Sequence, residues 1–175
     1  MVSRVFIRKP NEADSKELIS LRYKSRDFHS PWVFLPPTEE SCGTYIHRCQ
    51  ADNFEGMLIC LCENRQIIGV ANLSQIFYRR FQNAYLGYYV HVDFAGQGLM
   101  TEGIHLVINH AFYTLGLHRI EANIQPQNVA SIRLVQRLGF TKEGFSLRYL
   151  KIDGAWRDHE RWALTVEDWY QGLLG

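Results

Sequence analysis

The chain has 175 residues, of which 46% are hydrophobic and 21% are charged, and its formal net charge at pH 7 is +1. This length suits a sizeable core, and we expect a single domain over residues 1–175. The near-neutral charge argues against direct binding to nucleic acid or to a membrane surface, since either would require a basic excess. We expect neither a signal peptide nor a membrane span, because Arg4, Arg8 and Lys9 interrupt the first apolar segment and no apolar run approaches about 20 residues.

The four cysteines predict free thiols. Cys60 and Cys62 are two residues apart on an expected strand, where they share a face and cannot bridge without distorting it. Cys42 and Cys49 lie on an expected helix, and the sequence contains no Cys-x-x-Cys or His-x-x-x-His pair. We therefore expect four free buried thiols, no metal ion and a reducing, cytoplasmic location.

Local signals predict helices and strands throughout the first half of the chain. Asn11 is expected to cap a helix, with Asp14 completing the capping box, and Leu18 and Leu21 mark the buried stripe of that helix. The expected elements are a strand at residues 2–7, a helix from residue 11, a proline-rich loop at 30–37, a helix at 39–50, and strands at 56–62, 67–76 and 84–92.

The second half is predicted to alternate helices and strands before a closing hairpin. Apolar residues at helical spacing predict a long helix that Gly116 ends. The elements expected after it are a strand at 118–125, a helix at 128–138, two strands within 140–164 joined at Asp153-Gly154, and a short helix capped by Thr165 with Asp168. Three strands in succession cannot all be parallel, whereas a β-α-β unit favours a parallel crossover. We therefore expect a mixed α/β fold whose sheet is mostly antiparallel, with helices on both faces.

The turn Gly96-Gln97-Gly98 lies between the strand expected at 84–92 and the long helix. Backbone N–H groups of such a turn and of the first helical turn point the same way, and the helix dipole favours negative charge there, so the segment suits a phosphate. Leu99 and Met100 follow where a P-loop would carry Lys and Ser or Thr, and the third glycine of a dinucleotide site is missing. By itself the turn indicates an anion site or a plain tight turn.

A second pattern lies at the start of the helix expected at 128–138. Asn128 and Ser131 are three residues apart, and the helix runs into Gly139-Phe140. By themselves these residues indicate helix capping, with Asn128 as the N-cap and Ser131 completing a local hydrogen-bond pattern.

Several further segments accompany these two patterns. They are Gly69-Val70-Ala71-Asn72-Leu73-Ser74, Tyr85-Leu86-Gly87-Tyr88, His118-Arg119-Ile120, Lys142-Glu143-Gly144 and Ile152-Asp153-Gly154-Ala155-Trp156-Arg157-Asp158-His159. From about residue 69 to residue 169 the chain resembles the GNAT superfamily of acyl-CoA N-acyltransferases, and within it the RimJ/RimL group. Those enzymes acetylate the N-terminal α-amine of ribosomal proteins, and the RimJ branch, specific for alanine, is the nearest. The resemblance implies a GNAT fold of about seven strands with a splayed parallel pair beside the glycine turn.

The resemblance implies acetyl-CoA as co-substrate and assigns residues to it. Backbone groups of Val90 and Val92 would pair with the pantetheine amides, much as an added strand pairs with a sheet edge. Asn128 would contact the pantetheine arm and Ser131 the sulfur, and the acceptor amine would arrive between the strands expected at 84–92 and 118–125. The N–H groups expected to hold the pyrophosphate belong to Gln97, Gly98, Leu99, Met100 and Thr101.

The implied reaction is direct attack of a neutral amine on the thioester. An α-amine titrates near about 8, so roughly a tenth is already neutral at pH 7 and a weak base suffices. Glu102 is the leading carboxylate for that base, although a favourable charge at a helix N-terminus is the simpler interpretation of this residue. His91 is a second candidate, and Ser131 would hydrogen-bond to the leaving thiolate.

Aromatic residues predict the acceptor side. Trp32, Phe34, Tyr78 and Tyr85 line a peptide groove or fill the core, and Trp32, in a proline-rich loop, and Tyr85 are the expected substrate contacts. We expect acetylation of an N-terminal alanine or serine of a ribosomal or other protein, by a monomer or homodimer. The alternatives are acetylation of a small amine, such as a polyamine, amino sugar or toxin, and a ribosome-assembly factor that binds acetyl-CoA without needing turnover.

Overall fold

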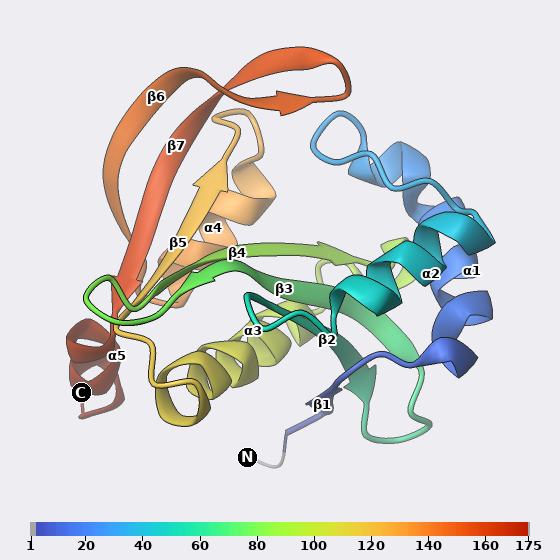
Figure 1. Ribbon diagram of the computed structural model, residues 1–175, viewed down its shortest axis with the longest axis horizontal. Helices are drawn as coiled ribbons and strands as arrows, with labels where there is room; N and C mark the ends of the chain where they lie inside the picture. Colours follow the sequence, from blue (N-terminus) through green and yellow to red (C-terminus); the bar gives the residue numbers. More distant parts are fainter. Residues whose placement is uncertain (1–2, 175) are drawn as a thin grey trace.

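A seven-stranded sheet with the order β1-β2-β3-β4-β5-β7-β6 forms the centre of the structure, a computed structural model that describes residues 3–174 (Figure 1). Only β4 and β5 are parallel, and every other neighbouring pair is antiparallel. The predicted mixed, mostly antiparallel sheet is thus confirmed. The strands are β1 (Val5–Arg8), β2 (Phe54–Leu61), β3 (Ile67–Phe77), β4 (Asn83–Val90), β5 (Arg119–Ile124), β6 (Thr141–Ile152) and β7 (Ala155–Thr165).

Helices cover both faces of the sheet, as predicted. One face packs against α1 and α2, with Leu18, Leu21 and Tyr89 in its buried cluster. The other face packs against α3 and α4 around Ile104 and Val135. The helices are α1 (Ser15–His29), α2 (Glu39–Arg48), α3 (Leu99–Asn109), α4 (Val129–Arg137) and α5 (Val166–Leu174). None of the described helices is long and apolar enough to cross a membrane.

The parallel pair β4 and β5 separates soon after it forms. Their register covers only three pairs, from Asn83 with Arg119 to Tyr85 with Glu121. Further along, the N–H of His91 bonds to the carbonyl of Ile68, which places β3 on one edge of β4. Because backbone groups alternate between the two edges of a strand, those of Leu86, Tyr88 and Val90 face the opening toward β5. The splayed parallel pair implied by the resemblance is therefore present.

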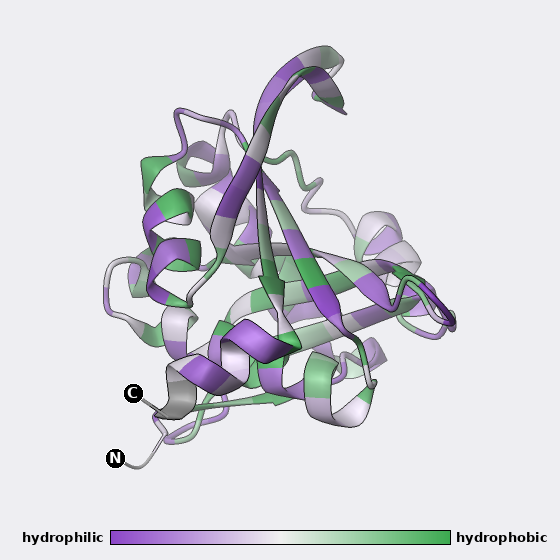
Figure 2. Ribbon diagram, turned by 90° about the vertical axis from the view of Figure 1, so that its left-hand side faces the viewer, coloured by the Kyte–Doolittle hydropathy of each residue, from purple (hydrophilic) through white to green (hydrophobic). Residues whose placement is uncertain are grey.

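Two protrusions frame this opening. The loop between α1 and α2 lies on one side, and the long β6–β7 hairpin extends past the body of the sheet on the other (Figures 1 and 2). The hairpin turn lies at Asp153-Gly154, as predicted, and both residues have positive φ. Figure 2 shows hydrophilic and hydrophobic residues alternating along the hairpin, and apolar side chains such as Leu147 and Trp156 are exposed there.

Local predictions at the ends of elements hold with a few exceptions. The capping box of Asn11 and Asp14 is present, although the first turn there is a 3₁₀ helix (Glu12–Asp14). Val92 was expected on a strand, but β4 ends at Val90 and Val92 begins a 3₁₀ turn, where its N–H donates to the Ser25 hydroxyl at 3.0 Å. The four thiols are free, but Cys62 is exposed because β2 ends one residue before it. Val2, predicted to begin the first strand, lies outside the described residues.

Candidate active site

A cavity of about 420 Å³ lies beside the open edge of β4. Its walls come from four places: the end of α1 with the loop after it, the end of β4, the glycine turn with the start of α3, and α4. This volume is within the usual range for small-molecule and cofactor sites. The cavity is therefore lined by helices from both faces of the sheet, at the point where β4 and β5 separate.

The glycine turn forms one wall of the cavity. Gly96 and Gly98 have φ of +75° and +78°, a conformation that side chains disfavour, so glycine is required at both positions. Gly98 caps α3, and the first N–H groups of that helix have no partner within the helix. The Gln97 amide braces the turn by donating to the Asp93 carbonyl at 2.8 Å. The predicted combination of turn and helix N-terminus is thus present.

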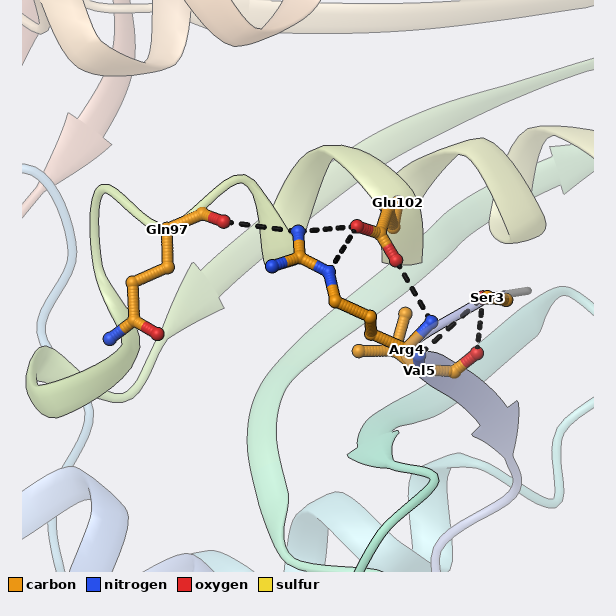
Figure 3. A network of polar contacts seen from close by, with 5 residues as sticks. All are labelled: Ser3, Arg4, Val5, Gln97 and Glu102. Atoms are coloured by element: carbon orange, nitrogen blue, oxygen red, sulfur yellow. Dashed lines mark hydrogen bonds and ion pairs between the residues drawn. The ribbon is translucent and has the colours of Figure 1, made fainter. Parts of the chain in front are cut away.

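Arg4 of the segment before β1 holds the turn and the start of α3 together (Figure 3). Its guanidinium donates to the Gln97 carbonyl at 3.1 Å and pairs with the carboxylate of Glu102. The backbone N–H of Arg4 also donates to Glu102, at 3.1 Å. Hydrogen bonds from Arg4 hold the pKa of Glu102 below its ordinary value. Glu102 does not line the cavity, so the expectation that it is the base is not supported: its carboxylate is a poorer base, directed at Arg4.

The start of α4 brings two hydroxyl groups together inside the cavity. The Asn128 side chain accepts from the Ser131 N–H at 3.2 Å, which confirms it as the N-cap. The Ser131 hydroxyl lies 2.6 Å from the Tyr88 hydroxyl of β4, and either oxygen can donate. Burial raises the pKa of Tyr88 to about 12, although its hydrogen bond with Ser131 opposes that rise. Tyr88 is therefore protonated at neutral pH and able to donate.

Positive charge lies at the α4 wall of the cavity. Arg133 and Arg137 are one helical turn apart and both line the cavity. Arginine fits phosphate oxygens through its planar fork of N–H donors. These two residues can therefore supplement the backbone N–H groups of the glycine turn in holding an anion.

The cavity gathers most of the predicted site residues. Those that line it are Trp32, Val90, Gly98, Met100, Thr101, Asn128 and Ser131. Those that do not are Tyr85, Val92, Gln97, Leu99 and Glu102. The Leu99 side chain is buried in the core. Tyr85 lies near the start of β4, close to Glu121 of β5, and does not line the cavity.

Lining residues that were not predicted as site residues include His29, Tyr88, Arg133 and Arg137. Tyr88 belongs to a strand whose alternation places it on the face of Val90, so the pattern could have identified it. Arg133 and Arg137 are spaced i, i+4, which puts them on one side of the helix. His29 precedes the Pro31-Trp32 loop, and no local signal connects it to β4.

The fold combines a glycine turn at a helix N-terminus, an arrangement that suits a phosphate group, with a neighbouring strand whose edge is free. The acetyltransferase (GNAT) domain family matches residues 4–141. The chain therefore belongs to the GNAT family and is an N-acetyltransferase.

Named relatives and a solved structure agree with this assignment. The [ribosomal protein uS5]-alanine N-acetyltransferase of Escherichia coli is 35% identical over 185 residues, covering 97% of this chain and 91% of the relative. A spermidine N(1)-acetyltransferase of Vibrio cholerae is 25% identical over 134 residues, covering 77% and 75% of the two chains. The structure of Mycobacterium smegmatis RimJ in complex with CoA-disulfide superimposes with a TM-score of 0.87 at 26% identity, covering 94% of this chain and 83% of that one.

Proposed function

We propose that this enzyme transfers the acetyl group of acetyl-CoA to the N-terminal α-amine of a protein that begins with alanine or serine. The observation that carries the proposal is the single cavity in which the glycine turn, the open edge of β4 and the Ser131–Tyr88 hydroxyl pair meet. Such a cavity can hold the phosphates, the pantetheine arm and the thioester of one extended cofactor in that order.

The cofactor's phosphates would lie at the glycine turn. Backbone N–H groups of Gln97 to Thr101 would bind the pyrophosphate, and Arg133 and Arg137 would add positive charge. The pantetheine amides would pair with the edge of β4 at Tyr88 and Val90, while Val92, whose N–H is engaged by Ser25, contributes no pairing. The Asn128 side chain caps α4 and would reach the same arm from the opposite wall.

The hydroxyl pair would assist the leaving thiolate. A thiol has a pKa of about 8.5, so its anion leaves without a strong acid and needs chiefly a hydrogen bond. Ser131 would donate that bond to sulfur, and Tyr88, 2.6 Å from the Ser131 oxygen, would donate to Ser131 in turn. Charge developing on sulfur would thus be shared by two connected hydroxyls.

The acceptor end of the cavity is apolar. Phe28, Trp32 and Val33 line it, and the described residues of the cavity wall include no Asp or Glu. The Gln125 amide, directly after β5, donates to the Trp32 carbonyl at 3.4 Å and so links the Trp32 loop to the end of β5. Polyamines carry several positive charges and would call for acidic groups, whereas a small uncharged N-terminal residue suits these walls. This favours a protein N-terminus over a polyamine.

A thiol-release assay with acetyl-CoA tests the proposal. Peptides that begin with Ala or Ser should release thiol and gain an acetyl group at the α-amine, and the same peptides with a blocked N-terminus should not react. Spermidine and an amino sugar complete the panel. Turnover on a small amine, without turnover on any Ala- or Ser-initial peptide, would overturn the assignment.

A further inference from the structure

His29, the last residue of α1, lines the cavity beside the end of β4. Its Nε2 is 2.7 Å from the backbone carbonyl oxygen of Val90, the last residue of β4. The ring is 6% exposed and packs edge-on against Tyr89, with 5.4 Å between ring centroids. The imidazole is thus held in one place, on the strand beside which the thioester would lie.

The contact with Val90 sets the tautomer of the ring. A carbonyl oxygen only accepts, so Nε2 must carry the hydrogen in this bond. In the neutral ring Nδ1 then has a free lone pair. Within residues 3–174, Nδ1 has no hydrogen-bond partner, and it is not one of the polar atoms sealed from solvent. A rigid, unpartnered proton acceptor therefore remains at the cavity.

The surroundings of His29 keep the ring neutral. Burial lowers its pKa, the hydrogen bond to Val90 opposes this, and His91 from the segment after β4 lowers the pKa further. Tyr89 is the titratable group that faces the ring from β4, and burial raises its pKa, so it carries no charge there. His91, by contrast, uses its own Nδ1 to accept the Asp93 N–H at 3.2 Å.

We propose that Nδ1 of His29 is the general base of the acetyl transfer, an inference that rests on the proposed function. The neutral amine nitrogen attacks the thioester carbon, and its excess proton passes to Nδ1 as the C–N bond forms. The C–S bond then breaks, and the electron pair stays on the sulfur as a thiolate, which accepts a hydrogen bond from Ser131 and takes its proton from water. The imidazolium returns its proton to water, so protons balance over one turnover.

The test compares His29→Gln, His29→Ala and the control His47→Gln, which alters an exposed residue of α2. Glutamine can keep a donor toward the Val90 carbonyl but offers no base. We expect His29→Gln to lower kcat/KM on an Ala-initial peptide by about 10²-fold, with the Kd for acetyl-CoA changed less than threefold. Imidazole in the buffer should restore part of the activity of His29→Ala, and His47→Gln should match the wild type.

The pH profile separates a base from a merely structural residue. In the wild type, a plot of log kcat/KM against pH should rise with slope 2 below the pKa of His29, because both the imidazole ring and the amine must lose a proton there. Between the pKa of His29 and the pKa of the amine, the slope should be 1, because only the amine must still lose a proton. In His29→Gln the slope should be 1 throughout. The base assignment alone would be overturned if the wild type acetylates the peptide and the His29→Gln variant keeps both the wild-type kcat/KM and the slope of 2. A wild type that acetylates no amine would overturn the proposed function and the base together.

Discussion

Substitution of Gly98 by alanine separates the two roles of the glycine turn. Gly98 has φ of +78°, and a Cβ built there would lie 3.4 Å from the Arg4 guanidinium, so alanine fits by volume. The cost is therefore in the backbone, at about 1–2 kcal/mol for a side chain in the left-handed region. For a chain of this size that cost lowers Tm by roughly 2–8 °C.

Cofactor binding should fall at the same time. Relief of the strain rotates the neighbouring peptide N–H groups away from the phosphate. Each hydrogen bond lost to a charged group costs about 1.5–3 kcal/mol, so the Kd for acetyl-CoA should rise roughly 10- to 150-fold. Calorimetric titration with acetyl-CoA measures this change, and thermal unfolding measures the loss of stability.

Gly116→Ala is the matched control. Gly116 has φ of +66°, a Cβ there would meet nothing within 4 Å, and the residue lies beyond α3, outside the cavity wall. We expect a similar loss of Tm with an unchanged Kd. Equal affinities for acetyl-CoA in the two variants would refute the phosphate role of the turn and leave only its role in shaping the chain.

Three other changes test the site and its supports. Tyr88→Phe removes the hydroxyl that contacts Ser131. The kcat should fall about 10-fold, in line with the loss of a hydrogen bond of about 1.5 kcal/mol, while the Kd for acetyl-CoA stays constant. A change confined to the Kd would contradict the role of Tyr88 at the leaving group. Glu102→Gln removes the largely exposed ion pair with Arg4, so the free energy of unfolding should fall by less than about 1 kcal/mol. The kcat/KM should stay within twofold of the wild-type value, and a loss of about 10²-fold in kcat/KM would restore Glu102 as the candidate base. Asp14 is buried, which raises its pKa, but hydrogen bonds from a neighbouring arginine and from backbone hold that pKa below its ordinary value. The stabilisation by the Asp14 carboxylate is therefore present above about pH 4, the pKa in the unfolded chain, and is lost as the pH falls through the lower pKa in the folded protein. The difference in Tm between the wild type and Asp14→Asn should be constant near neutral pH and should disappear in acid.

Local chemistry made much of the fold predictable. Capping residues such as Asn11 and Asn128 satisfy backbone groups within their own turn, so their role is readable without any distant partner. The Gly96 and Gly98 positions require a backbone conformation that other residues avoid, and the hairpin at Asp153-Gly154 has the same cause. The mixed, mostly antiparallel character of the sheet followed from three strands in succession and a later β-α-β unit, since parallel neighbours need a crossover.

The resemblance to a known family added what local patterns lacked. Asn128 with Ser131 indicates a helix cap by spacing alone, and only together with the glycine turn does it indicate a coenzyme A site. The structure then brought both segments to one cavity.

The amino-acid sequence by itself determined the elements, the glycine turn and the family, because each depends on residues close together in the chain. The tertiary structure decided which side chains face one another. His29 meets Val90 across 61 positions, Tyr88 meets Ser131 across 43, and Arg4 pairs with Glu102 across 98. Those contacts follow from how α1 and α4 pack on the sheet and from the position of β1 at its edge. Periodicity and capping specify that a helix forms and which face it buries, but carry no information on the partner that its last residue meets.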